Sequence, residues 1–224
     1  MIETKRPAVE LCRAMRAIHQ RGWCEGTGGN FSCRLRRDPL QLLMAPSGVD
    51  KGALRPRDLI VVDGGGSVTQ GSGRPSAETL LHIALMEGAD AGAVLHTHSQ
   101  AGTLISRLEL KLEQAERTPA GRRPATVVHR DLEMLKGLEG IRTHATQVEV
   151  PVFANDQDIA RLAATVKPLL PRCPWGFLVA GHGLYAWGAD LPSARRHLEI
   201  HEFLLEQRWR CLLLERTGTW EHRP

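Results

Sequence analysis

The chain has 224 residues, of which 42% are hydrophobic, and this is enough to bury a sizeable core. The formal net charge is +4, aromatics make up 4% and the basic residues are scattered, which argues against a nucleic-acid platform and leaves a small anionic substrate as a use for the positive charge. The five cysteines are irregularly spaced, so we expect reduced thiols. The sequence shows neither a signal-like segment nor an apolar run of membrane length, so we expect a cytoplasmic protein with no membrane partner.

The first half of the chain is predicted to form a helix, several strands and a second helix. Apolar residues at helical intervals predict the first helix over residues 7–20. Glycine-rich and Pro-Ser-Gly turns separate short apolar runs and predict strands within residues 25–35, 41–48 and 58–66. Ser76 is expected to be the N-cap of the second helix, over residues 76–88.

The second half alternates strands with helices. The predicted elements are a strand over residues 91–99, a helix over 101–110, strands over 124–129 and 146–153 around a helical segment at 129–138, a helix over 158–170, a strand, turn and strand over 176–188, a long helix over 191–215, and a frayed tail over 219–224. Because several strands are joined by hairpin-like turns, this order favours an α/β domain with a mixed sheet over a purely parallel one. We expect a single domain over residues 1–224.

Two histidines close to each other end one of the predicted strands, in the segment AVLHTHSQ. Residues i and i+2 of a strand point to the same face, so His96 and His98 present their imidazoles together, at a spacing suited to one metal ion. Taken alone, the pair leaves a second interpretation open, in which one histidine is exposed and the other is hydrogen-bonded in the core.

A third ligand is predicted at His182, in the segment LVAGHGLYAWG. Glycines on both sides allow the backbone to turn tightly and free the imidazole to point outward. Three histidines would leave a coordination position open for substrate, as a catalytic metal site requires. His197 and His201 lie four residues apart on the long helix and could chelate a metal, but packing or solvent exposure is their expected role.

Three tight turns offer backbone NH groups and hydroxyls to an anion. They are GTGGNFS at residues 26–32, APSG at 45–48 and RPSAE at 74–78. Ser76 would lie at a helix N-terminus, where the helix dipole favours a phosphate. A phosphorylated small substrate is therefore expected, whereas a nucleoside triphosphate is not implied, because no turn matches GxxxxGK[ST].

Two glutamates compete for a proton-transfer role. Glu78 follows Ser76 at the start of the predicted helix, and Glu133 lies in HRDLEMLKG. Each is equally compatible with an ordinary helix surface, so the residues alone do not choose between them.

The segments TGGNFS, PSG, PSAET, AVLHTHS and GHGLYAWG, in this order along nearly the whole chain, resemble the class II aldolase/adducin-head family. The resemblance implies a three-layer α/β/α domain with a central mixed, largely antiparallel sheet, one zinc ion per subunit and a homotetramer. By position, it implies metal ligands at His96, His98 and His182, and an acid/base role for Glu78. It implies a phosphate site formed by the following residues: Gly29, Asn30, Ser47, Gly48 and Ser76.

Within the family, the segments RGW, PSGVDKG, EMLKG and GHGLYAWG are most similar to a dehydratase branch acting on 5-methylthioribulose 1-phosphate in methionine salvage. That similarity implies loss of water from this substrate, with the EMLKG glutamate, Glu133, favoured over Glu78 as the acid/base. The alternatives are a sugar-phosphate aldolase or epimerase of the fuculose or ribulose type, which would depend on Glu78, and a non-catalytic adducin-like interaction module. Retention of the three histidines argues against the module.

Overall fold

The strands form one mixed sheet in the computed structural model, which describes residues 4–115 and 125–217. Within those residues the sheet has nine strands in the order β4-β3-β2-β1-β5-β9-β8-β7-β6. All neighbouring strands run antiparallel except β7 and β8, which are parallel. The strands are β1 (Asn30–Arg36), β2 (Gln41–Met44), β3 (Ile60–Asp63), β4 (Val68–Gln70), β5 (Ala93–Thr97), β6 (Ala125–Arg130), β7 (Gln147–Phe153), β8 (Gly176–Val179) and β9 (Gly183–Gly188).

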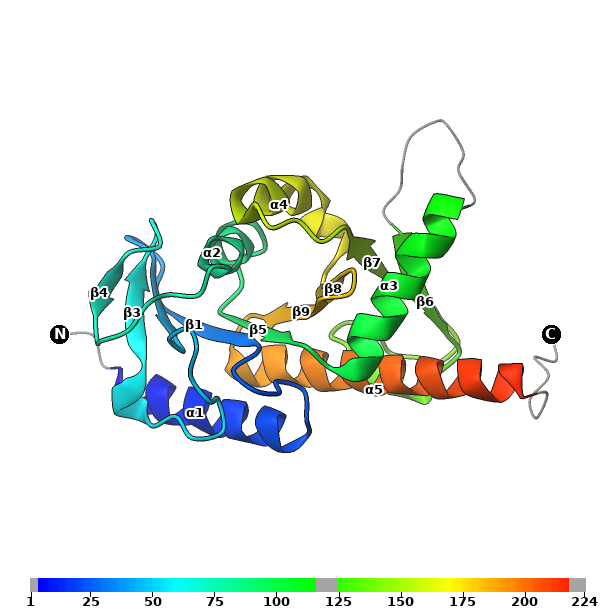
Figure 1. Cartoon of the computed structure of the whole chain (residues 1–224), viewed down its shortest axis with the longest axis horizontal. Helices are drawn as coiled ribbons and strands as arrows, with labels where there is room; N and C mark the ends of the chain where they lie inside the picture. The colour runs from blue at the N-terminus through cyan, green and yellow to red at the C-terminus, as the bar shows by residue number, and fades with distance from the viewer. Residues whose placement is uncertain (1–3, 116–124, 218–224) are drawn as a thin grey trace.

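Helices cover both faces of this sheet. They are α1 (Lys5–Gln20), α2 (Thr79–Gly88), α3 (Gln100–Ala115), α4 (Ile159–Val166) and α5 (Leu191–Arg216), with 3-10 turns η1 (Pro56–Asp58), η2 (Glu133–Gly137) and η3 (Lys167–Arg172). One apolar core joins α1, α3 and α5 to the sheet, and another joins α2, α4 and η3 to its other face. Figure 1 shows α2 and α4 on one side of β5 and β9, and α1 and α5 on the other. The expected three-layer α/β/α architecture with a largely antiparallel sheet is confirmed.

Burial of large apolar side chains stabilises these layers. On α5, Leu198 and Leu204 are fully buried against the sheet, and Leu81 and Leu85 of α2 are fully buried on the opposite face. Each such side chain contributes about 1.5–3 kcal/mol relative to exposure. The long helix α5 thereby forms a fixed support beneath the central strands.

The register of the central strands brings polar residues from distant parts of the sequence side by side. Asn30 of β1 pairs with His96 of β5, and His96 in turn pairs with Tyr185 of β9. Thr97 of β5 is opposite Leu184. The three middle strands of the sheet therefore align residues from three separate segments around His96.

The start of α2 differs from the expected one. The helix begins at Thr79 with Glu78 in the N-cap position, so the predicted start at Ser76 is wrong. The Ser76 hydroxyl accepts a hydrogen bond from the Glu78 backbone N at 3.2 Å, and Thr79 N donates to Ser76 O at 3.1 Å, which closes a separate turn before the helix. This turn directs the Glu78 side chain away from the helix surface.

Other boundaries differ less. The first helix begins at Lys5, so Pro7 lies in its first turn, where its missing N–H costs nothing. The edge strand β4 and the turn η1 were not predicted, because their short polar segments lack an apolar alternation. The predicted frayed tail at 219–224 lies outside the described residues.

His197 and His201 are buried, as packing residues would be. His197 Nδ1 lies 2.7 Å from Trp187 O. No helix in the described ranges is both long enough and apolar enough to cross a membrane.

Candidate metal centre

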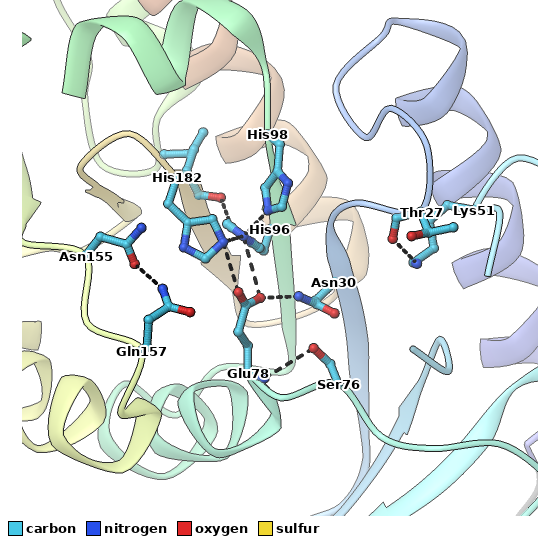
Figure 2. A network of polar contacts seen from close by, with 11 residues as sticks. Thr27, Asn30, Lys51, Ser76, Glu78, His96, His98, Asn155, Gln157 and His182 are labelled. Atoms are coloured by element: carbon cyan, nitrogen blue, oxygen red, sulfur yellow. Dashed lines mark hydrogen bonds and ion pairs between the residues drawn. The ribbon is translucent and has the colours of Figure 1, made fainter. Parts of the chain in front are cut away.

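The three predicted ligands meet at one point. His96 is the last residue but one of β5, His98 directly follows the strand, and His182 lies in the turn between β8 and β9. Each offers one ring nitrogen, and these nitrogens lie within 4.8 Å of one another. His98 Nε2 is 2.8 Å and His182 Nε2 is 3.3 Å from His96 Nε2. Figure 2 shows the three rings turned toward one another above Glu78.

The His96 ring is oriented by its neighbours. Its Nδ1 donates to the carbonyl oxygen of Leu184 at 2.9 Å, and its plane stacks on Tyr185 with ring centroids 3.9 Å apart. Because a carbonyl accepts but does not donate, the proton of a neutral imidazole is on Nδ1 and the lone pair is on Nε2, facing the other two histidines. Burial lowers the pKa of His96 and of His98, which favours the neutral form that binds a metal.

This donor set fits a divalent cation. Three imidazole nitrogens that face one another at hydrogen-bonding distances, one of them with its lone pair fixed inward, would repel unless a proton or a cation lay between them. A metal ion bound by all three nitrogens satisfies each lone pair, and the carbonyl of Leu184 supplies the outer hydrogen bond that orients His96. Three histidine ligands also leave a position open for substrate.

Glu78 completes the polar network at the histidines. Its Oε1 is 2.9 Å from His182 Nε2, its Oε2 is 3.6 Å from His96 Nε2, and the Asn30 side-chain amide donates to Oε2. Burial opposes ionisation of this carboxyl, but the hydrogen bond with His182 and the electrostatic interactions with His96 and His182 lower its pKa overall. Glu78 is therefore an ionised, largely buried carboxylate beside the histidine nitrogens.

Glycines make room for this site. A Cβ on Gly183, which follows His182, would lie 1.9 Å from Thr97 O, and the residue has φ +156°. A Cβ on Gly29, with φ +77°, would lie 2.8 Å from His96 O. Residues with a side chain do not fit at either position, so the glycines of GHG and TGGN allow their loops to approach β5.

The residues predicted to hold phosphate lie on loops that adjoin Glu78. Ser47 N donates to Arg74 O at 2.9 Å and thereby joins the second loop to the third. Asn30, from the first loop, contacts Glu78, as does Ser76 through the Glu78 backbone. Gly48 has φ +71°, and no atom lies within 4 Å of a Cβ built on it, so this turn is open. Hydrogen bonds thus connect the three loops to one another and to Glu78, and Figure 2 shows Asn30 and Ser76 beside this residue.

Glu133 lies in a different environment. It begins η2, its side chain is 69% exposed, and it forms ion pairs with Lys136 and, at 3.9 Å, with His144. Within the part of the chain that the structure describes, none of its polar contacts involves the three histidines. The structure thus groups Glu78, and not Glu133, with the predicted ligands.

Three residues near the centre were missed in the sequence. Tyr185 stacks on His96, and its position three residues after His182 in a strand was the available signal. Lys51 is 2% exposed and donates to Thr27 O and Val49 O, both at 2.9 Å, where the sequence showed an ordinary turn lysine. Glu202, a buried acid on α5, contacts Thr97 and gave no signal among the neighbouring glutamates of the helix.

The chain is similar to known proteins over most of its length. The family described as "Class II Aldolase and Adducin N-terminal domain" matches residues 9–209. A protein named methylthioribulose-1-phosphate dehydratase, from Pseudomonas savastanoi pv. phaseolicola, is 44% identical over 203 residues, which cover 89% of this chain and 92% of the relative. A relative of the same name from Methylococcus capsulatus is 44% identical over 202 residues, covering 89% of this chain and 91% of that protein.

A solved structure has the same fold. YgbL from Escherichia coli, described as a putative aldolase/epimerase/decarboxylase, superposes with a TM-score of 0.72 at 25% identity and covers 98% of this chain and 91% of its own. The family match spans the histidines, Glu78 and the three loops alike. The chain therefore belongs to the class II aldolase and adducin N-terminal domain family.

Proposed function

We propose that the protein is a zinc-dependent dehydratase that converts 5-methylthioribulose 1-phosphate to 5-methylthio-2,3-dioxopentyl 1-phosphate in methionine salvage. The observation that carries this proposal is the convergence of three histidine nitrogens within 4.8 Å in a chain 44% identical to proteins named as this dehydratase. We further propose that residues 1–224 act as one catalytic domain in a cytoplasmic homotetramer. All five cysteines being free supports a reducing compartment.

His96, His98 and His182 would hold the metal ion. Bound there, a divalent ion would draw electrons from the C2 ketone of the substrate and acidify the proton on C3. Zinc is proposed because imidazole nitrogens in a compact set are ligands that zinc prefers, although such sites also accept other divalent ions. The chain supplies the orientation, since the Leu184 carbonyl and the Tyr185 ring fix His96.

The phosphate would be held by Gly29, Asn30, Ser47, Gly48 and Ser76. Their three loops meet beside Glu78, and hydrogen bonds between Ser47 and Arg74 and between Ser76 and Glu78 fix their relative positions. Backbone NH groups in turns with positive φ, as at Gly29 and Gly48, form concave anion sites. A phosphate bound there would keep the sugar in reach of the histidines.

Two proton transfers complete the reaction, because one proton leaves C3 and the C4 hydroxyl leaves as water. Glu78 contacts His182 and His96 and is held ionised, so it is suited to accept a proton or to contact the metal. A group that stays ionised is a poor proton donor to the leaving hydroxyl. We propose Glu133, favoured by the family resemblance, for this second role.

A second candidate is a sugar-phosphate aldolase, and the contact of Glu78 with His182 favours it, because the aldolase alternative depends on Glu78. One experiment separates the two. Purified protein is incubated with 5-methylthioribulose 1-phosphate and with fuculose 1-phosphate, with and without a chelator. A dehydratase consumes the first with loss of one water, and an aldolase cleaves the second. If neither is consumed and no metal copurifies, the chain is a non-catalytic module.

A further inference from the structure

Thr97, the last residue of β5, lies between His96 and His98 and faces the opposite side of the sheet. His96 and His98 point toward Glu78 and His182, whereas the alternation of the strand turns Thr97 toward α5. Thr97 is fully buried, and its hydroxyl donates to Oε1 of Glu202. The segment that presents two ligand nitrogens is thus tied to the helical layer behind it.

Glu202 is an unusual residue for its place on α5. It is 2% exposed and belongs to a buried face that includes Leu198 and Leu205. Its Oε2 is buried and has no partner at full hydrogen-bonding geometry among the described residues, and the Ser99 side chain, directly after His98, also interacts with the carboxyl. An apolar side chain would avoid the cost of burying this carboxyl, so packing alone does not account for it.

Two other glutamates of the helix are partly exposed and paired with arginines. Glu199 pairs with Arg195 at 2.8 Å, and Glu206 pairs with Arg210 at 2.9 Å. Glu202 instead directs an oxygen at the one residue between two predicted ligands. Its contact is therefore specific to this position on the helix.

The other anchors of the ligand segment act from different directions. His98 N donates to Trp23 O at 2.8 Å, and His96 Nδ1 donates to Leu184 O at 2.9 Å. Both bonds hold the histidines themselves. The peptide units that set the distance between the two rings belong to Thr97, and its hydroxyl is held by Glu202.

We propose that Glu202 is a positioning residue, which holds Thr97 from behind the sheet and thereby fixes the His96 and His98 nitrogens at metal-binding separation. The inference rests on the proposed metal site. It extends that site to a carboxylate that touches neither the ligands nor the substrate.

The test measures zinc binding to metal-free protein by competition with a chromogenic chelator. Loss of a residue that orients metal ligands from the outer shell typically weakens metal affinity by about 10–100-fold. We expect Glu202→Leu and Thr97→Val each to weaken zinc binding by this factor. Because both variants remove the same contact, the double variant should bind zinc as tightly as the single variant with the lower affinity. Thr97→Ser keeps the hydroxyl and should stay within about 3-fold of the wild type. Glu206→Gln, one turn further along α5, is the matched control and should bind as the wild type does.

Substitution of cobalt gives a second measurement, because its visible spectrum reports ligand geometry independently of turnover. We expect Thr97→Val to change this spectrum and Glu206→Gln to leave it unchanged. If Glu202→Leu does not fold, Thr97→Val tests the same contact from the other end. Wild-type affinity and spectrum in folded Thr97→Val would overturn the inference. Absence of zinc binding by the wild-type protein would instead remove the metal site and the proposed function with it.

Discussion

Oε1 of Glu78 lies 2.9 Å from Nε2 of His182, although the two residues are far apart in the sequence. Glu78 directly precedes α2, and His182 lies between β8 and β9. The same carboxylate approaches His96 and accepts a hydrogen bond from Asn30. This contact ties the predicted metal ligands to the loops proposed to bind phosphate. Metal binding and substrate binding are therefore expected to depend on one another.

Loss of a single ligand should remove the metal. We expect His96→Ala and His98→Ala each to copurify with little zinc and to lose more than about 100-fold in kcat/KM, because two imidazoles bind the ion far less tightly than three. Metal analysis of the purified variants checks this. His144→Ala, whose side chain is 60% exposed, is the control for metal content. Stoichiometric zinc in both ligand variants would refute the ligand assignment.

The two glutamates should separate by their effect on metal content. Glu133→Gln is expected to lower kcat by about 10²–10⁴-fold while leaving zinc bound, because its loss removes a proton-transfer group and not a contact of the ligands. Glu78→Gln is expected to lower activity and to weaken metal binding as well, since it contacts two of the histidines.

Steady-state kinetics with metal analysis distinguishes these outcomes, and Glu149→Gln, an exposed acid on β7, is the matched control. Full activity of Glu133→Gln would assign both proton transfers to Glu78.

The close approach of the GHG turn to β5 should be sensitive to one methyl group. A Cβ on Gly183 would lie 1.9 Å from the Thr97 carbonyl oxygen, so Gly183→Ala must displace the turn that carries His182. We expect a loss of about 2–3 kcal/mol in the free energy of unfolding, together with lower zinc content. Urea unfolding measures the first. Gly64→Ala, where the nearest atom is 3.4 Å away, should change neither, and an unaffected Gly183→Ala would show that the turn is not closely fitted.

Buried neutral histidines should make the protein acid-sensitive. Burial lowers the pKa of His129 to about 4 and that of His201 to about 3, whereas an unfolded histidine titrates near pH 6.5. Below about pH 6.5 each histidine binds a proton in the unfolded state but stays neutral in the folded state. Each histidine therefore lowers the free energy of unfolding by about 1.4 kcal/mol per pH unit as the pH falls toward the pKa of the folded state.

Glu202 acts in the opposite direction, because burial raises its pKa to about 7 and its contribution to stability is lost as pH rises from about 4.5 toward 7. A single variant isolates the histidine effect. His129→Gln should reduce the fall in urea-unfolding free energy between pH 6.5 and 5 by about 2 kcal/mol, and the exposed His144→Gln should not change it. Equal slopes for wild type and His129→Gln would contradict the prediction.

Local patterns in the sequence predicted much of the fold and the histidines that the structure brings together. The alternation of AVLHTHS placed His96 and His98 on one face, and the glycines around His182 indicated a tight turn. The helix start at Ser76 was wrong because its hydroxyl bonds to the Glu78 backbone in a separate turn. A local pattern does not reveal such competition between two hydrogen-bonded turns.

Long-range contacts explain what the sequence did not reveal. The contact of Glu78 with the histidines depends on the fold, because the sequence made Glu78 and Glu133 equally compatible with a helix surface. Glu202 is more than a hundred positions from Thr97, and nothing in its neighbourhood on α5 distinguishes it from Glu199 or Glu206. Only the packing of α5 beneath β5 reveals that contact.

The measurement that tests the central claim most directly is reconstitution of metal-free protein with zinc, followed by the rate of water elimination from 5-methylthioribulose 1-phosphate. The proposed site predicts no turnover without metal and a rate that rises in proportion to added zinc until one ion is bound per chain. Full turnover by the metal-free protein, or no water elimination from this substrate at full zinc occupancy, would contradict it.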